Sequence, residues 1–407
     1  MSRTLRFGVN YVPSKGWWYS WIDWDDAALR ADLDAIAALG CDHIRIHCLW
    51  PVFQPNPNLV SELMLSRLGR LLDYAGSAGL DVIVTVLDGW LSGFDFRPSW
   101  LGDGANIFTD RAVVDSERDL ISAIAERIGR HERFIGFDVA NEPNVLVGGP
   151  KNATTRSEGD SWVVEILQHC EQVAPSKLHS VGMDHQPWLR DDGSFGRQIL
   201  SEAGTVTPIH AWVYFTGAME RYGETGTGTL HLCEYMLELA KAYHHDSKRQ
   251  VWLQEYGISP EWVARLSPAE FLEHATISAA TVDNLWGITW WCSHDIDRQL
   301  GGFAALEYDL GLLTARNEVK PIGHRFRAIV EEIRSGRRGA AALRTVALVL
   351  PHARTPDLEF ADAFFDLIDQ GVAPAIVLEG RASDTEYLAS REIVTVIDFV
   401  EAGMRLR

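Results

Sequence analysis

The chain has 407 residues, which is enough for one barrel-sized domain and a small companion. Its 56 acidic residues outnumber its 37 basic residues, and the net charge of -19 argues against nucleic acid and membrane surfaces as partners. Five cysteines without a CxxC pair cannot form a complete disulfide framework, and because we recognise no signal peptide and no bilayer-length apolar run, we expect a cytoplasmic protein.

Strand and helix patterns alternate along the first half of the chain. Short apolar runs predict strands, and apolar residues three or four positions apart, such as Leu29, Leu33 and Ile36, predict the helices between them. The fourth run ends abruptly in the polar residues Asn141 and Glu142. The predicted pairs are 7–12 with 25–39, 43–47 with 61–78, 81–87 with 112–128, and 134–143 with 161–173.

The same alternation continues in the second half, although the fifth unit, with its strand at 178–183, is the least regular. Eight units in all predict a parallel (β/α)8 TIM barrel. A doubly wound open sheet fits less well, because no GxGxxG turn follows the first strand. The remaining pairs are 207–212 with 230–243, 250–255 with 268–283, and 286–291 with 321–335.

A smaller α/β unit is predicted at the carboxyl-terminal end. The small and basic residues of 335–342 indicate a linker. We therefore divide the chain into a catalytic barrel at 1-336 and a small C-terminal α/β accessory domain at 343-407. The accessory domain would contain strands at 345–350, 375–378 and 393–397 and helices at 358–370 and 385–390.

Two glutamates stand where a parallel barrel carries its chemistry. Glu142 follows the fourth strand and Glu255 ends the seventh, and these strands face each other across a barrel. Retaining glycoside hydrolysis requires two such carboxyl groups, one as the nucleophile and the other as the acid and then the base. A single glutamate at a strand end is more often a salt bridge or a helix cap, but the pair favours catalysis.

Here the chain resembles the clan A glycoside hydrolases, and family 5 most closely, over residues 5–335. The resemblance is carried by Val-Ala-Asn-Glu-Pro at 139–143, Gln-Glu-Tyr-Gly at 254–257 and Trp-Cys-Ser at 291–293. It implies that Glu142 is the acid/base and Glu255 the nucleophile. By the same similarity, Asn141 would bind the sugar 2-hydroxyl.

The resemblance also implies roles for three other residues. Arg45 would hydrogen-bond the nucleophile and keep it charged, although a salt bridge at the barrel end is the alternative. Trp291 would form the platform under the sugar ring, while its neighbour Trp290 points the other way. His210 matches the histidine of the sixth strand, with a buried core histidine as the alternative.

Two departures from the family pattern leave further candidates. The third strand ends in Asp88 instead of the usual histidine, and Asp88 would either bind a sugar hydroxyl or serve a structural role. The sixth strand has Trp212 where the family commonly has tyrosine. The tyrosine's contact would then come from Trp212, Tyr214 or Tyr256.

The composition itself favours a sugar ligand. The 15 tryptophans are concentrated in predicted loops, among them Trp18 after the first strand and Trp90 after the third. Aromatic faces stack on pyranose rings, although core packing explains any single tryptophan equally well. We expect neither a metal nor a cofactor, because His244 and His245 are adjacent in sequence and no HExxH motif is present.

The expected partner is a mono- or oligosaccharide, and association into a homo-oligomer is left open. The likeness to the β-mannosidase branch of family 5 implies a retaining exo-β-mannosidase that releases mannose from the non-reducing end of short β-mannosides. An endo-β-mannanase or β-glucosidase of the same fold is one alternative. A non-catalytic carbohydrate-binding barrel is the other.

Overall fold

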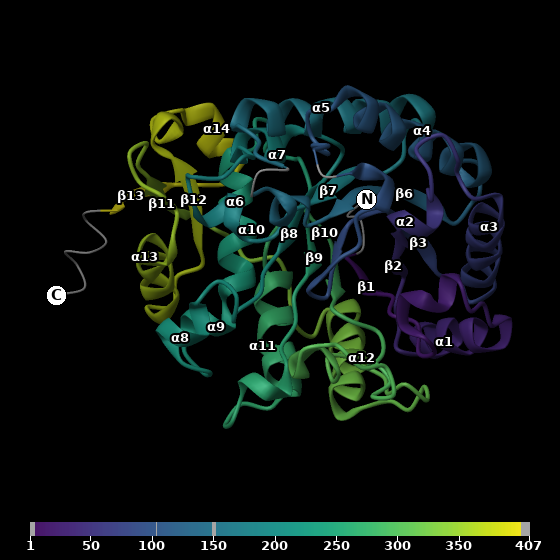
Figure 1. Ribbon diagram of the computed structural model, residues 1–407. Helices are drawn as coiled ribbons and strands as arrows, with labels where there is room; N and C mark the ends of the chain where they lie inside the picture. Colours follow the sequence, from purple (N-terminus) through teal and green to yellow (C-terminus); the bar gives the residue numbers. More distant parts are fainter. Residues whose placement is uncertain (1–4, 103, 149–151, 400–407) are drawn as a thin grey trace.

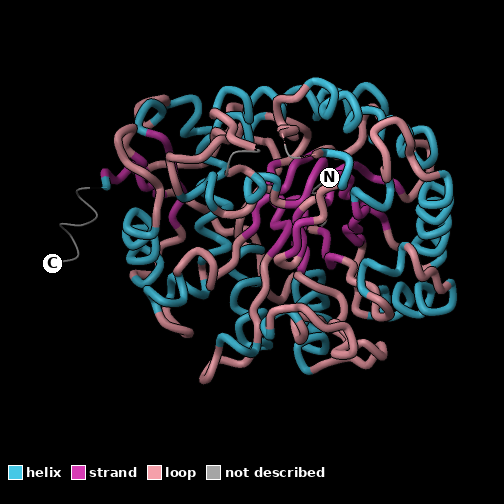
Figure 2. The backbone as a smooth tube through the Cα atoms, viewed as in Figure 1, coloured by secondary structure: helices cyan, strands magenta, loops and turns pink. Residues whose placement is uncertain are grey.

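The computed structural model describes residues 5–102, 104–148 and 152–399 (Figure 1). Eight parallel strands form one sheet in the order β7-β6-β3-β2-β1-β10-β9-β8, and Figure 2 shows them gathered at the centre with helices around them. The fold is a (β/α)8 TIM barrel, which confirms the prediction. The strands are β1 (Arg6–Asn10), β2 (His43–Leu49), β3 (Asp81–Asp88), β6 (Phe134–Asn141), β7 (Ser180–Gly182), β8 (Thr207–His210), β9 (Val251–Glu255) and β10 (Leu285–Trp290).

Each barrel strand is followed by a helix that covers the outside of the sheet. Side chains at the helix starts accept backbone N–H groups, as Asp25 does for the first helix, and Thr155 and Ser267 form capping boxes. The helix α7 was not predicted from sequence. The helices are α1 (Asp26–Ala38), α3 (Glu62–Ser77), α4 (Arg111–Ile128), α5 (Arg156–Val173), α7 (Arg197–Glu202), α10 (Leu232–Tyr243), α11 (Pro268–Ala280) and α12 (Pro321–Arg334).

The loops at the carboxyl ends of the strands carry short elements of their own. A two-stranded antiparallel hairpin follows β3, and short helices follow β2, β7 and β8. Within the described residues, no helix is both long and apolar enough to cross a membrane. These short elements are α2 (Trp50–Phe53), β4 (Trp90–Leu91), β5 (Phe94–Asp95), α6 (Gln186–Leu189), α8 (Ala218–Tyr222) and α9 (Thr227–Leu230).

The barrel closes between β7 and β8, the one neighbouring pair of described barrel strands that is not linked by a hydrogen-bonded ladder. The two strands contact each other, but no ladder pairing links them in the described part of the chain. Instead the Thr205 amide donates to the His179 carbonyl at 2.9 Å, and the His179 amide donates to the Thr205 hydroxyl at 2.8 Å. His179, directly before β7, and Thr205, two residues before β8, therefore close the cylinder.

Polar side chains alternate along the inside of β2 and reach across the barrel. The ring Nε2 of His43 lies 2.8 Å from the Thr289 hydroxyl of β10. Arg45 pairs with Asp138 of β6 at 2.6 Å, and both side chains are fully buried. A buried charge of this kind requires full pairing, so the Arg45 guanidinium fixes the arrangement of the strand ends around it.

A separate three-stranded parallel sheet in the order β12-β11-β13 follows the barrel. Buried ion pairs join it to α10, Arg344 with Glu234 at 2.7 Å and Arg391 with Glu238 at 2.8 Å. Although burial opposes the charged form, these cations and Lys241 lower the pKa of Glu238 to about 2. The elements are β11 (Val346–Leu350), α13 (Leu358–Asp369), β12 (Pro374–Leu378), α14 (Thr385–Ser390) and β13 (Thr395–Asp398).

Candidate active site

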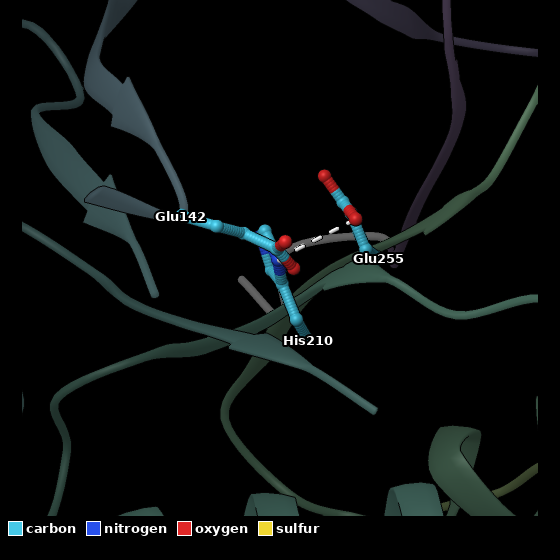
Figure 3. A group of neighbouring side chains, drawn as sticks. All are labelled: Glu142, His210 and Glu255. Atoms are coloured by element: carbon cyan, nitrogen blue, oxygen red, sulfur yellow. Dashed lines mark hydrogen bonds and ion pairs between the residues drawn. The ribbon is translucent and has the colours of Figure 1, made fainter. Parts of the chain in front are cut away.

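Two glutamates and one histidine meet at the carboxyl ends of the barrel strands (Figure 3). Glu142 follows β6, His210 ends β8 and Glu255 ends β9. One carboxylate oxygen of each glutamate and one ring nitrogen of His210 lie within 4.8 Å of one another. The two side chains predicted to form the catalytic pair are thus brought together.

Glu142 sits in a turn that aims its side chain into the barrel mouth. Its backbone is left-handed, with φ 44° and ψ 49°, and its amide donates to the Gly182 carbonyl at 2.8 Å. A non-glycine residue in this region is strained and is held there by its surroundings. Burial raises the pKa of Glu142 to about 8, and repulsion from Asp184 acts in the same direction while Arg45 opposes it.

Glu255 is surrounded by groups that favour its charged form. The Arg45 Nη1 atom lies 2.6 Å from Oε1, and the Trp212 indole N–H donates to Oε2 at 3.3 Å. Burial raises the pKa of Glu255, the charge of Arg45 counteracts this rise, and repulsion from Glu142 adds to it. Burial and a neighbouring carboxylate raise the pKa of both acids, but Glu255 also accepts hydrogen bonds from Arg45 and Trp212 that favour its carboxylate form.

Arg45 connects both halves of the site. Its Nε and Nη2 atoms donate to Asp138 at 2.9 and 2.6 Å, and Nη2 also donates to the Asn141 side-chain oxygen at 2.8 Å. Asn141 in turn donates through Nδ2 to the Trp90 carbonyl at 2.9 Å. Both oxygen and nitrogen of the Asn141 amide are thereby oriented before any ligand arrives.

His210 lies between the two acids and is fully buried. Its Nδ1 atom is 2.8 Å from Glu142 Oε1 and 3.4 Å from Glu255 Oε2, while Nε2 is 2.8 Å from Gln254 Oε1. Burial lowers the pKa of His210, which keeps the ring uncharged near neutral pH. An uncharged ring at this place can bind a carboxyl group without competing with Arg45 for negative charge.

The glutamates open into a cavity of about 460 Å³. Four of the predicted sugar-binding residues, Asn141, Trp90, Trp212 and Trp291, line it. Trp291 is 5% exposed and presents an aromatic surface next to the acids, whereas Trp290 points away and donates to the Leu310 carbonyl at 3.1 Å. A concave site with aromatic walls and a few polar groups suits a sugar.

Aromatic side chains from three loops pack together behind residues that line this cavity. Trp17 follows β1, Phe94 lies in the hairpin after β3, and Phe303 lies in the loop after β10. The Trp17 ring is 4.8 Å from Phe303 and 5.8 Å from Phe94, and Phe94 is 5.1 Å from Phe303. We call Trp17, Phe94 and Phe303 the aromatic wall; they pack in one cluster with Trp212 and Trp291. Their chain neighbours Gly93 and Ala304 line the cavity.

Two further predicted residues lie one layer below the cavity. The Asp88 carboxylate is 3.1 Å from His47 Nδ1, and both side chains are buried. His47 packs edge-on against Trp291 at 5.6 Å and also contacts Trp18 at 5.3 Å. Asp88 and Trp18 therefore support the Trp291 platform and are not among the residues that line the cavity.

The two tyrosine candidates lie outside the cavity, which corrects our expectation of direct sugar contacts. The Tyr256 hydroxyl lies 2.6 Å from the Thr276 hydroxyl, and the residue is fully buried between β9 and α11. Tyr214 is half-exposed and stacks on Trp262 at 4.5 Å with an interplanar angle of 7°. Of the three candidates for the tyrosine contact, the one that reaches Glu255 is Trp212.

Several cavity residues were missed by sequence reasoning. Asp184, His185 and Arg190 come from the loop after β7, and Ser92 and Glu307 come from the opposite side. Burial raises the pKa of Glu307 to about 7, while a hydrogen bond with Ser92 opposes this rise. Asp184 could have been found from the sequence, since it directly follows the predicted strand 178–183 and the catalytic pair also lies at strand ends. The others lie in irregular loops without periodicity.

The arrangement of Glu142, His210 and Glu255 also has the spacing of a metal site. Arg45, however, already places a fixed positive charge 2.6 Å from Glu255. A divalent cation would have to share that carboxylate with the guanidinium, and this repulsion disfavours metal binding.

A larger cavity of about 790 Å³ lies at the amino ends of the strands, next to Arg6 and Trp286. Its two acidic residues, Glu132 and Glu171, are exposed to solvent. The Lys177 ammonium donates to the Phe134 carbonyl at 2.7 Å. Nothing in this cavity resembles the buried acid pair at the other end.

Comparison with known proteins gives a consistent result. Residues 6–187 match the family model Cellulase (glycosyl hydrolase family 5). A GH5_18 protein from Streptomyces cattleya, solved in complex with Manβ1-4GlcNAc, is 38% identical, with a TM-score of 0.94 over 98% of this chain and 100% of that one. A GH5_18 protein from Bifidobacterium longum subsp. longum ATCC 55813, also with Manβ1-4GlcNAc, is 33% identical, with a TM-score of 0.90 over 97% and 96%.

A more distant structure shares the fold. The exo-beta-1,4-mannosidase Op5Man5 from Opitutaceae bacterium strain TAV5 is 24% identical, with a TM-score of 0.77 over 93% of this chain and 70% of that one. No curated protein matches the sequence.

Proposed function

The chain belongs to glycosyl hydrolase family 5, and from this premise we propose that it is a retaining exo-β-mannosidase that releases mannose from the non-reducing end of short β-mannosides. Membership of the family makes the protein a glycoside hydrolase. The stereochemistry, the direction of attack and the sugar are the parts that we propose.

The acid pair is the observation that carries the proposal. Oxygens of Glu142 and Glu255 lie within 4.8 Å of each other. Retaining enzymes hold their two carboxyl groups about 5–5.5 Å apart, whereas inverting enzymes need about 6.5–9.5 Å to admit a water molecule. The short separation supports a double displacement with retention.

The environments of the two acids support a division of labour. Glu142, with its pKa raised to about 8, would be protonated at neutral pH and would act as the general acid. Glu255, against Arg45 and Trp212, would attack C1 as the carboxylate. As the C1–O bond breaks, Glu142 would pass its proton to the departing oxygen.

The second half of the reaction would reverse these roles. Glu142, now a carboxylate, would take a proton from a water molecule as the water's oxygen attacks C1. As the new C1–O bond forms, the bond between C1 and Glu255 would break and return its electron pair to the Glu255 carboxylate, which frees the sugar with its original anomeric configuration. Asn141 is oriented by Arg45 to bind the 2-hydroxyl throughout.

Exo action is supported by the aromatic wall. Trp17, Phe94 and Phe303 pack together beside Gly93 and Ala304, which line the cavity, and we propose that the loops they hold stop a sugar chain from extending past the ring that would lie on Trp291. A volume of about 460 Å³ is also at the low end of the roughly 300–1,000 Å³ that small-ligand sites occupy.

The sugar is proposed from the relatives. Two GH5_18 proteins at 38% and 33% identity were solved with Manβ1-4GlcNAc. We therefore propose that this chain cleaves mannose β-linked to N-acetylglucosamine, with other short β-mannosides as poorer substrates.

A substrate panel tests the proposal. Purified protein is offered aryl β-mannoside, aryl β-glucoside, Manβ1-4GlcNAc and mannan, and the first product is followed by NMR. We expect hydrolysis of the aryl β-mannoside and the disaccharide, with β-mannose formed first. A preference for the glucoside, rapid cleavage inside mannan, or α-mannose as the first product would contradict the sugar, the exo action or the retention, respectively.

A further inference from the structure

The loop after β7 lines the cavity next to the proposed acid Glu142. Asp184, His185 and Arg190 line the cavity there. The Arg190 side chain is exposed and forms no hydrogen bond or ion pair with any other residue in the described part of the chain. Its guanidinium donors are therefore free to bind a ligand.

The C-terminal unit contacts this loop through a hydrogen bond. The hydroxyl of Thr355, between β11 and α13, donates to the carboxylate of Asp191, the residue after Arg190. Arg197 binds the same carboxylate at 2.6 Å and also donates to the Arg190 carbonyl at 2.7 Å. The backbone at Arg190 is thus fixed from the barrel and from the C-terminal sheet together.

Arg190 and His185 also border a second cavity of about 540 Å³, which Thr355 and Asp357 line from the C-terminal sheet. The two side chains therefore stand as a partition between this second cavity and the catalytic one. The Glu142 amide donates to the carbonyl of Gly182, at the end of β7, at 2.8 Å, so this loop lies beside the proposed acid. Because that acid protonates the departing oxygen, the partition faces the leaving part of the substrate.

From these contacts we propose that Arg190 is a specificity-determining residue that binds the sugar on the leaving side, and that the C-terminal sheet positions it through Thr355 and Asp191. This inference rests on the proposed β-mannosidase function. A guanidinium offers five N–H donors to hydroxyl oxygens and to an acetamido carbonyl. A nitrophenyl leaving group has neither hydroxyl nor acetamido oxygen to accept them.

The test compares two substrates with the full-length protein. We measure kcat/KM for Manβ1-4GlcNAc and for 4-nitrophenyl β-mannoside in the wild type, Arg190→Gln and Thr355→Val. Losing a charged hydrogen-bond donor should reduce kcat/KM for the disaccharide by about tenfold or more, chiefly through KM, with a much smaller loss for the aryl substrate. Thr355→Val should shift the ratio in the same direction by about two- to fivefold, because it loosens the loop without removing the donor.

Matched controls carry the same substitutions elsewhere. Arg327→Gln changes an exposed arginine on α12, and Thr395→Val changes an exposed threonine on β13 of the same C-terminal sheet. Neither should change the ratio of the two kcat/KM values. Thermal unfolding of all four variants separates a loss of folded protein from a change in specificity.

The outcomes for the two proposals are distinguishable. Suppose that the wild type cleaves both substrates. If Arg190→Gln then lowers kcat/KM equally for both, or for neither, the inference about Arg190 is overturned and the β-mannosidase function stands. If the wild type cleaves no β-mannoside, the proposed function fails, and the inference built on it fails with it.

Discussion

The two ends of the barrel carry cavities of opposite character. The larger one, at the amino ends, is about 790 Å³ and keeps Glu132 and Glu171 in contact with water. The smaller one, at the carboxyl ends, is about 460 Å³ and holds the half-buried Glu142 and the buried Glu255 near Arg45. The two cavities therefore differ in the burial and pairing of their acids, and this difference, rather than cavity volume, prepares carboxyl groups for glycoside hydrolysis.

The two ends should differ most when one acid at each is neutralised. Glu255→Gln removes the proposed nucleophile and should reduce kcat for an aryl β-mannoside by about 10⁴-fold or more. Glu171→Gln makes the same change at the amino end and should leave kcat unchanged. Steady-state kinetics with both variants checks this, and substantial activity in Glu255→Gln would exclude a covalent intermediate on that residue.

Neutralising the other buried acid should give a loss that depends on the leaving group. Glu142→Gln removes the proposed proton donor, so hydrolysis of the disaccharide should fall by about 10²–10⁴-fold. An activated aryl glycoside needs less protonation of its oxygen and should lose less. Rates for a series of leaving groups check this, and equal losses across the series would remove the assignment of Glu142 as the acid.

The pH profile should report the environment of the buried pair. The active form needs protonated Glu142 and ionised Glu255. Because the pKa of Glu142 is raised to about 8, kcat/KM should fall as the pH rises through about 8. The pKa of Glu255 is also raised, so an acid limb should appear above the range of an ordinary glutamate. The two limbs belong to the interacting pair, and a profile that stays flat to pH 10 would contradict a buried acid of this kind.

The free energy of unfolding should also depend on pH through Glu142. The pKa of Glu142 in the folded state is raised, so its ionisation costs stability above the unfolded pKa, and the cost grows until the pH passes about 8. Glu142→Gln should therefore raise the melting temperature more at pH 9 than at pH 5. Calorimetry at both pH values checks this, with Glu171→Gln as the exposed control, and an equal shift at both pH values would contradict it.

The smallest expected effect comes from a neighbouring charge. Asp184→Asn removes a carboxylate that repels the ionised Glu142 and should move the basic limb to lower pH by about one unit or less. In the wild type, the Asn144 side chain donates to the Asp184 carboxylate at 2.6 Å. The side-chain amide of Asp184→Asn can still accept this hydrogen bond. Asp192→Asn, an exposed change in the same loop, should leave the limb in place, and equal profiles for the two variants would show that Asp184 does not influence Glu142.

The sequence predicted the barrel because each strand is a local apolar run and each helix has a local periodicity. The acid pair was predictable for the same reason, since Glu142 and Glu255 directly end such runs. The strands β7 and β8 are shorter than the predicted 178–183 and 207–212. Their pairing ends earlier because the chain turns into the loops that line the cavity.

The rest of the site depends on packing that no local pattern encodes. Asp88 and Tyr256 occupy strand ends, as the acid pair does, but His47 and Thr276 bind them away from the cavity. Arg190 and Glu307 lie more than a hundred positions apart, and only the closed barrel places both at one cavity. The division at 1-336 and 343-407 remains a prediction.

The Thr205–His179 join has a consequence for how the barrel opens. Ladders of backbone hydrogen bonds hold the other neighbouring strands, whereas here one threonine supplies the contacts through its amide and its hydroxyl. Local opening starts where few backbone bonds must break. Amides along β7 and β8 should thus exchange with solvent deuterium before those of β2 and β3. Local opening of the barrel should therefore begin between β7 and β8.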